Sequence, residues 1–197
     1  MVINPQFEAT NSFSDGLAEV RIGDVTSGKW GYIDKTGKVV INPQFSGGDF
    51  GLFDAGKLIS FGSFREGLAA VRIGDEKSGK WGFIGKDGRF VINPQFDEVF
   101  PFNEGLAVVR VGDNGTSRFG YIDGTGKYVI NPQFDWTYGF DSGLALVRIG
   151  DDKTGKFGYI DKTGKFVVNP QFDATEGFTK DGLAVVKIAG KYGYITR

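Results

Sequence analysis

A unit of about 38 residues recurs five times along this 197-residue chain, and it constrains the fold more than any other feature. Asn-Pro-Gln-Phe begins at positions 4, 42, 93, 131 and 169, with spacings of 38, 51, 38 and 38 residues. Gly-Leu-Ala begins at 16, 67, 105, 143 and 182, and an aromatic residue precedes glycine at 30, 81, 119, 157 and 192. Recurrence of this kind indicates a repeat architecture, in which each unit packs on its neighbours.

The first half of each unit is predicted to form two β-strands. The run from Leu17 to Ile22 alternates with a period of two, so we expect Ala18, Val20 and Ile22 to share a buried face. The run Trp30-Gly31-Tyr32-Ile33 is the second strand. Its glycine recurs in all five units, which predicts the close approach of a neighbouring backbone or ring.

A hairpin turn and a third strand complete the unit. The run from Asp34 to Lys38 is predicted to be the turn, because Asp can bond its own backbone and Gly supplies a positive φ. Val39–Ile41 is the third strand, and we expect Asn42-Pro43 to end it because proline cannot donate to a ladder. The corresponding segments end near residues 7, 45, 96, 134 and 172, and an insertion occupies about 46–63. Residues 1–197 are expected to form a single all-β repeat domain.

The stretch Lys-Trp-Gly-Tyr-Ile-Asp at 29–34 and its copies resemble the WG repeat family, a bacterial family of β-repeats named for its Trp-Gly pair. The resemblance covers essentially the whole chain. Trp30 and Trp81 keep the indole, whereas Phe119, Phe157 and Tyr192 replace it, so the ring matters more than the indole N–H. The resemblance implies a bacterial origin and carries over no catalytic residues.

The two ends of the chain predict a closed arrangement of the repeats. Residues 2–7 match a third strand, and residues 192–197 match the second strand of the last unit. We therefore expect five blades closed into a propeller-like ring, in which the N-terminal strand completes the last unit and removes an exposed edge. An open solenoid of stacked β-hairpins is the alternative.

Composition and charge restrict the classes of function. The formal net charge of −1 gives no electrostatic footprint for nucleic acid, and no apolar run approaches the ~20 residues of a membrane span. The absence of Cys and His excludes thiolate nucleophiles, zinc fingers and Ser-His-Asp triads. No signal peptide begins the sequence, and we expect a cytoplasmic monomer.

No cofactor or metal is predicted. Residues 23–29 match most of a P-loop, but Trp30 and a strand follow where Ser or Thr and a helix are required. The acidic loops at Asp24, Asp75, Asp113 and Asp151 could offer oxygen ligands to Ca²⁺, although plain turns explain them.

The candidate binding residues fall into three groups. A basic residue recurs at one position of the unit and would form a circle of positive charge in a closed ring, able to hold an anion; pairing with nearby aspartates is the alternative. The insertion carries aromatic candidates around a hairpin tip at residues 54–56, and the variable segment 135–139 carries two more. The residues are Arg21, Arg72, Arg110, Arg148 and Lys187; Phe50, Phe53 and Phe61; and Trp136 and Tyr138.

Ten aromatic residues of the second strands are expected to pack in the core between units, with a sugar-stacking platform as the alternative. They are Trp30, Trp81, Phe119, Phe157, Tyr192, Tyr32, Phe83, Tyr121, Tyr159 and Tyr194. From these patterns we predict a non-enzymatic binding or scaffold module for a protein or a glycan. The alternatives are a structural or engineered repeat without a ligand, and a glycan-acting enzyme with a carboxylate pair. Such a pair would come from Glu8, Asp97, Glu98, Asp135, Asp173 and Glu176.

Overall fold

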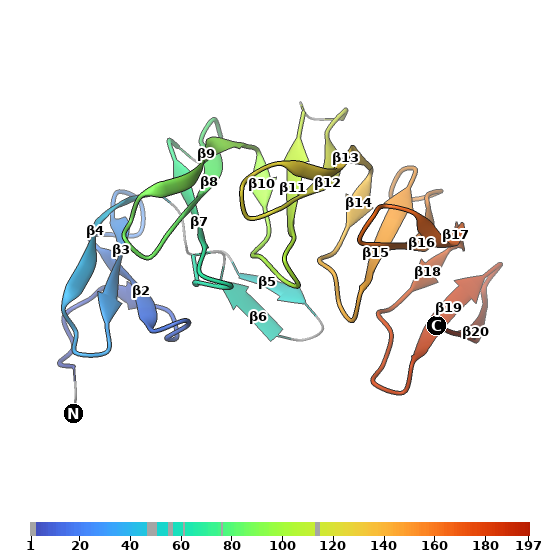
Figure 1. Ribbon diagram of the computed structural model, residues 1–197, viewed down its shortest axis with the longest axis horizontal. Helices are drawn as coiled ribbons and strands as arrows, with labels where there is room; N and C mark the ends of the chain where they lie inside the picture. The colour runs from blue at the N-terminus through green and yellow to red at the C-terminus, as the bar shows by residue number, and fades with distance from the viewer. Residues whose placement is uncertain (1–2, 47–50, 55–56, 61, 76, 113–114) are drawn as a thin grey trace. The chain divides into compact units, whose positions relative to one another are not determined.

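The protein is built from short antiparallel β-sheets joined by turns (Figure 1). The computed structural model describes residues 3–46, 51–54, 57–60, 62–75, 77–112 and 115–197. These residues contain no helix, and so no helix that is long and apolar enough to cross a membrane. They pack into two compact units, the first formed by Met1–Phe102 with Gly124–Gly126 and the second by Asn103–Asp123 with Lys127–Arg197.

The first unit contains two complete repeats and the insertion. β1 (Ala9–Thr10), β2 (Leu17–Ile22), β3 (Lys29–Asp34) and β4 (Val39–Phe45) form a four-stranded sheet in that order. β7 (Ala69–Ile73), β8 (Lys80–Ile84) and β9 (Phe90–Phe96) form the next sheet, and the short β10 (Glu98–Val99) follows. Within the insertion, β5 (Gly51–Asp54) pairs with β6 (Lys57–Ser60) as a separate hairpin.

The second unit repeats the same pattern. β12 (Arg118–Ile122) pairs with β11 (Ala107–Val111) on one side and with β13 (Tyr128–Phe134) on the other. β14 (Trp136–Thr137), β15 (Leu144–Ile149), β16 (Lys156–Asp161) and β17 (Phe166–Phe172) form a four-stranded sheet. β18 (Ala174–Thr175), β19 (Leu183–Ile188) and β20 (Lys191–Thr196) form a three-stranded one. The prediction of an all-β chain of five repeats is confirmed, and no closed sheet is found among the described residues.

The glycine of the second strand allows the third strand to bulge across it. Trp30 pairs with Phe45 and Tyr32 with Ile41, so Gly31 alone faces the three residues from Asn42 to Gln44. A Cβ on Gly31 would lie 2.5 Å from the Ile41 carbonyl oxygen and 2.6 Å from the Pro43 nitrogen. The predicted close approach is therefore confirmed, and the approaching group is backbone.

The prediction that Asn42-Pro43 ends the third strand is wrong. β4 continues through Pro43 to Phe45, and the equivalent strands in the other complete repeats do the same. A β-bulge leaves residues unpaired in the ladder, so a proline placed there removes no ladder hydrogen bond. The bulge explains how a strand can pass through Asn-Pro.

The predicted hairpin turn between the second and third strands is confirmed. The Asp34 carboxylate accepts hydrogen bonds from the backbone N–H groups of Thr36 (2.8 Å) and Lys38 (3.1 Å), and Gly37 has φ 88°. The Thr36 hydroxyl adds a 2.6 Å bond. The bond from Thr36 is the main reason that the pKa of Asp34 is lowered.

Consecutive repeats meet where a third-strand isoleucine packs on the hairpin-turn glycine of the following repeat. A Cβ on Gly88 would lie 3.1 Å from Ile41, and a Cβ on Gly164 would lie 3.2 Å from Ile130. Ile3, in the N-terminal segment, contacts Gly37 in the same way at 3.1 Å. The N-terminal segment therefore packs on the first repeat as an internal third strand packs on the repeat that follows it.

The core forms along the first and second strands. Ala18 and Val20 are buried as predicted, and so is Glu19 on the opposite face, 3% exposed. The prediction that Ile22 is buried is wrong, since it is 47% exposed. Ile22 pairs with Lys29 at the last position of the hairpin, beyond the part of the sheet that the neighbouring elements cover.

Core packing is confirmed for most of the second-strand aromatic residues. Tyr32, Tyr121 and Tyr159 are at most 1% exposed, and Trp30 and Phe83 are buried as well. The prediction is wrong for Tyr192 and Tyr194 of β20, which are 71% and 73% exposed. In the described part of the chain, β20 is the edge of its sheet, so no third strand covers these rings.

Candidate functional site

The recurring basic residue lies directly across from the aromatic ring of the aromatic-glycine pair. The strand registers pair a cation with a ring in every repeat: Arg21 with Trp30, Arg72 with Trp81, Arg110 with Phe119, Arg148 with Phe157 and Lys187 with Tyr192. In four of these pairs the cation stands over the ring, 5.6 Å from the centroid for Arg21 and Arg72, 6.0 Å for Arg148 and 5.0 Å for Lys187. Cation–π attraction and stem packing give this position a structural role.

Hydrogen bonding supports that structural role. The Nε atoms of Arg72 and Arg148 are buried without a hydrogen-bond partner among the described residues, as expected for guanidinium groups that lie against rings. The Arg148 Nη2 donates to Asp152 at 2.5 Å, so the predicted pairing with a nearby aspartate occurs there. Arg110 donates to the Ser117 hydroxyl at 3.4 Å. A circle of positive charge depends on ring closure and stays a prediction.

The two aromatic candidates of the variable segment form a cluster with Phe157, which we name the Trp136 patch (Trp136, Tyr138 and Phe157). The rings of Trp136 and Tyr138 lie 4.0 Å apart at 77°, and those of Trp136 and Phe157 lie 6.2 Å apart at 80°. All three side chains are partly exposed. Ala9, Glu98 and Ala174 occupy the position of Trp136 in other repeats, so the patch is specific to the fourth sheet.

The backbone beneath the patch is fixed by a buried hydroxyl network. The hydroxyl of Thr137, which is fully buried, donates to the Leu146 carbonyl at 2.8 Å and shares a short hydrogen bond with the hydroxyl of Tyr121. Because the Thr137 proton goes to Leu146, the Tyr121 hydroxyl proton is shared between Thr137 Oγ1 and the Tyr138 carbonyl, 2.8 Å from the Tyr121 oxygen. Burial raises the pKa of Tyr121, so its proton stays in place. The patch therefore stands on a rigid base.

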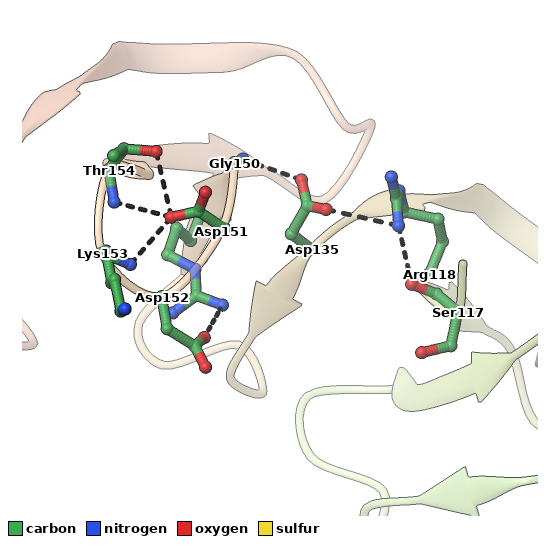
Figure 2. A network of polar contacts seen from close by, with 9 residues as sticks. Ser117, Arg118, Asp135, Gly150, Asp151, Asp152, Lys153 and Thr154 are labelled. Carbon is green, nitrogen blue, oxygen red and sulfur yellow. Dashed lines mark hydrogen bonds and ion pairs between the residues drawn. The ribbon is translucent and has the colours of Figure 1, made fainter. Parts of the chain in front are cut away.

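A network of charged groups includes Asp135, the residue that precedes Trp136 (Figure 2). The Asp135 carboxylate accepts a 2.8 Å hydrogen bond from the Gly150 N–H and pairs with the Arg118 guanidinium at 3.3 Å. Arg118 donates in turn to the Ser117 carbonyl at 2.9 Å. These contacts hold a negative and a positive group in defined positions, and Asp135 immediately precedes Trp136 in the sequence.

The Gly-Asp loop that follows Arg148 is closed by its own aspartate (Figure 2). The Asp151 carboxylate accepts hydrogen bonds from the backbone N–H groups of Thr154 (2.7 Å) and Lys153 (2.8 Å) and from the Thr154 hydroxyl (3.0 Å). The Thr154 and Lys153 amides, in that order, are the main reasons that the pKa of Asp151 is lowered. These contacts are those of an Asx turn, and Asp24 and Asp75 accept the equivalent backbone hydrogen bonds, which explains these three loops without a metal; Asp113 lies outside the described residues.

Outside the insertion, each variable segment begins with an acidic residue. In several repeats its carboxylate accepts a hydrogen bond from the loop that joins the first and second strands. Glu8 accepts from the Gly23 N–H at 3.2 Å, and Asp173 from the Ala189 N–H at 2.6 Å, as Asp135 does from Gly150. Asp97 forms an ion pair with Lys80, and Asp173 forms one with Lys156. The structure thus accounts for these candidate catalytic acids as structural anchors.

The structure describes only part of the insertion. Phe50 and Phe61 lie outside the described residues, as do residues 55 and 56 of the predicted hairpin tip. Phe53 lies in β5, which pairs with β6 from Gly51 opposite Ser60 to Asp54 opposite Lys57. Within the described ranges, no group of three or more acidic, His or Cys side chains could hold a metal ion.

Sequence reasoning missed the pairing of cations with rings, although a signal was present. The basic residue precedes its ring by nine positions in the first four repeats, as from Arg21 to Trp30. Equal spacing on both sides of a hairpin places two residues opposite one another. The Thr137–Tyr121 contact joins consecutive repeats, and its signal was the 16-residue spacing from Tyr to Thr that recurs at Tyr159 and Thr175.

Comparisons with known proteins agree with the repeat pattern. No curated protein matches the chain. The family model described as WG containing repeat matches residues 1–25, 30–50, 81–114, 119–153 and 157–192, well over half of the sequence. The chain therefore belongs to the family of WG containing repeats.

Proposed function

We propose that the chain is a non-enzymatic binding or scaffold module that recognises a protein or a glycan through the Trp136 patch. The observation that carries the proposal is the pairing of partly exposed rings, Trp136 and Tyr138, on a buried hydroxyl network. Aromatic residues with a rigid base provide large contact area at a small entropic cost, which is why they dominate binding surfaces.

The charged groups beside the patch add polar selectivity to this apolar contact. Asp135 and Arg118 offer an acceptor and a planar donor within the same network, and Arg148 with Asp152 offers a second pair (Figure 2). A ligand with both an apolar face and hydroxyl, amide or charged groups would match this arrangement. Sugars and peptide side chains both have this character.

The arrangement of the five repeats belongs to the proposal as well. In the predicted closed ring, the variable segments would lie together on one face, and the repeated basic row would form a circle. In an open solenoid, the same segments would line one side of an extended surface. The Trp136 patch is local to its sheet, so its function requires neither arrangement.

Two other functions are less well supported. A glycan-acting enzyme would need two carboxylates free to face a substrate, whereas Asp97, Asp135 and Asp173 are engaged with lysine, arginine or backbone groups. In a purely structural repeat, Trp136 would serve only to pack against the core cluster that contains Leu146 and Tyr159, although alanine or glutamate fills its position in other repeats. Trp136 is therefore the residue that separates a binder from a structural array.

The test is a glycan array together with a pull-down, both carried out with the wild-type chain, Trp136→Ala and Tyr128→Ala. Tyr128 is a matched control because it is a partly exposed aromatic residue of the same unit, 37% exposed and outside the patch. We expect one ligand to be retained by the wild type and Tyr128→Ala but lost by Trp136→Ala. Far-UV circular dichroism checks that all three proteins are folded.

A ligand that binds Trp136→Ala as well as the wild type would place recognition elsewhere and contradict the proposal. Turnover of a bound glycan would contradict its non-enzymatic part. Loss of turnover in Asp135→Asn and Asp97→Asn would then identify the acids responsible.

A further inference from the structure

The last strand of the fifth repeat has one edge without a strand partner among the described residues. β20 pairs with β19 on one side, with Tyr194 opposite Val185 and Tyr192 opposite Lys187. β16, the equivalent strand of the fourth repeat, pairs with β15 on one side and with β17 on the other. An exposed strand edge offers unpaired N–H and C=O groups to another chain.

The aromatic side chains of β20 are much more exposed than the equivalent side chains of β16, which a third strand covers. Tyr159 of β16 is 1% exposed, whereas its counterpart Tyr194 is 73% exposed. Tyr192 is 71% exposed, whereas its counterpart Phe157 is partly buried. Two large rings side by side on an open edge make an apolar surface that a third strand would cover.

The glycine of β20 gives the most specific sign of an empty site. A Cβ on Gly158 would lie 2.5 Å from the Val168 carbonyl oxygen and 2.7 Å from the Pro170 nitrogen, so the Asn-Pro backbone fills that space. A Cβ on Gly193 would meet nothing within 4 Å. Gly193 therefore keeps the space that an Asn-Pro bulge occupies in complete repeats.

A matching strand exists at the other end of the same sequence. Residues 2–7 read Val-Ile-Asn-Pro-Gln-Phe, identical to residues 40–45, 91–96 and 129–134. Ile3 already packs on Gly37, and Ile3 and Phe7 pack on the cluster of Ala18, Val20 and Ile33. Asn4, Pro5 and Gln6 are exposed, and residues 3–7 lie in no strand.

We propose that β20 is an acceptor site for the Ile3–Phe7 segment of a second copy of this chain. By the register of the fourth repeat, in which Phe157 faces Phe172 and Tyr159 faces Val168, Tyr192 would face Phe7 and Tyr194 would face Ile3. The Asn4-Pro5 bulge would pass over Gly193. Strand addition at a sheet edge combines main-chain hydrogen bonds with side-chain pockets in this way.

A second copy is favoured because the contact would reproduce an existing junction. Within the chain, Ile41 lies opposite Tyr32 of its own sheet and packs on Gly88 of the next repeat. Ile3 already makes the second of these contacts, on Gly37, and β20 of another chain would supply the first once residues 3–7 become a strand. The interface is heterologous, so it produces head-to-tail oligomers.

This inference does not depend on the Trp136 patch. The patch could fail to bind any ligand while the chains still associate, and the reverse also holds. The two proposals therefore have separate tests.

The test is light scattering after size-exclusion chromatography, from low to high micromolar concentration, on the full chain, Gly193→Ala and Gly177→Ala. The added methyl of Gly193→Ala blocks the bulge while meeting nothing within the chain itself. Gly177→Ala is the matched control, because its Cβ also meets nothing within 4 Å. We expect the wild type and Gly177→Ala to rise above the 21.4 kDa monomer mass and Gly193→Ala to remain at it.

Hydrogen exchange gives a second readout on the same samples, and it is followed at those backbone N–H groups of residues 191–196 that point away from β19. Protection that grows with concentration in the wild type and is lost in Gly193→Ala supports the proposal. Protection in a monomer at every concentration would mean that the chain's own N-terminal segment fills the site, and it would overturn the second copy as occupant. A monomer without protection would overturn the acceptor site itself.

Discussion

The fourth and fifth repeats carry the same Gly-Tyr-Ile motif in their second strands, but the motif has opposite surroundings in the two. In β16, Tyr159 is buried and shares a 2.5 Å hydrogen bond with the Thr175 hydroxyl. In β20, Tyr194 is 73% exposed. The motif determines which side chains face the position of the third strand. The presence of that strand determines whether these side chains are buried. Burial is thus a property of the neighbouring strand rather than of the motif.

The loops before the two strands differ as well. The fourth repeat has a Gly-Asp loop closed by the Asp151 carboxylate. The fifth has a tight turn in which Ala189 (φ 48°) and Gly190 (φ 79°) both lie in the left-handed region. These are the dihedral angles of the turn that fits two-residue hairpins, so the turn of the fifth repeat is set by its backbone geometry, and the Asp173 carboxylate accepts a hydrogen bond from the Ala189 N–H.

Truncation of the paired tyrosines should give the largest difference between the two repeats. We expect Tyr159→Ala to lower the free energy of unfolding by about 3–5 kcal/mol, because it opens a cavity in the core and removes the hydrogen bond between Tyr159 and Thr175. Tyr194→Ala should cost less than about 1 kcal/mol, as expected for an exposed residue. Urea unfolding at low protein concentration measures both, and equal losses would contradict the comparison.

The paired strand glycines provide the next test. Gly158→Ala should destabilise the chain by about 1–3 kcal/mol, because the methyl group would overlap the backbone of Val168 and Pro170. Gly193→Ala should stay within about 0.5 kcal/mol, since nothing lies within reach of its Cβ. Thermal unfolding of dilute samples compares the two. A large loss in Gly193→Ala at low concentration would show that its site is already filled within the chain.

Removal of the cation opposite the ring should have a smaller effect. Arg148→Met keeps much of the apolar stem over Phe157 but loses the charge, and we expect a loss of about 0.5–1 kcal/mol. Lys187→Met should lose less, since water already surrounds the Tyr192 ring. A double-mutant cycle with Phe157→Leu isolates the pair. A coupling energy near zero would leave the recurring cation without this explanation.

The smallest effect concerns pH and the Gly-Asp loop, which the fourth repeat has and the fifth lacks. Hydrogen bonds depress the pKa of Asp151 in the folded chain below the value of about 3.9 expected when it is unfolded. Their contribution is therefore present above about pH 4 and is lost as the pH falls through the folded pKa. Asp151→Asn should reduce the loss of stability on acidification. Urea midpoints of both proteins between neutral and acidic pH test this, and parallel curves would contradict it.

Much of the fold could be predicted because the residues that favour each strand and turn recur in five copies of the repeat. The hairpin turn at Asp34 and the glycine approach at Gly31 follow from chemistry within a few residues. The strand through Pro43 could not be predicted, because proline is permitted there only by a bulge that depends on the glycine of another strand. The exposure of Ile22 likewise depends on where the covering elements end.

The candidate site was predictable only in part. Trp136 and Tyr138 stand out because the copies differ there, yet their contact with Phe157 joins two strands and needs the observed register. The basic row was found as a recurring position, but its place over the rings follows from cross-strand pairing. Sequence periodicity identifies which positions recur. The contacts between strands determine what the residue at each position does.

The sequence by itself determined the number of repeats, the strand and turn chemistry and the family, because each rests on short-range patterns that recur. Only the tertiary structure decided which copies of the motif are buried, which rings meet cations and which edge stays open. These depend on strands brought together from distant positions or from neighbouring repeats. Identical segments such as Gly-Tyr-Ile in β16 and β20 therefore reach different states for a physical reason: the free energy of burial belongs to the contact, and a contact needs both partners.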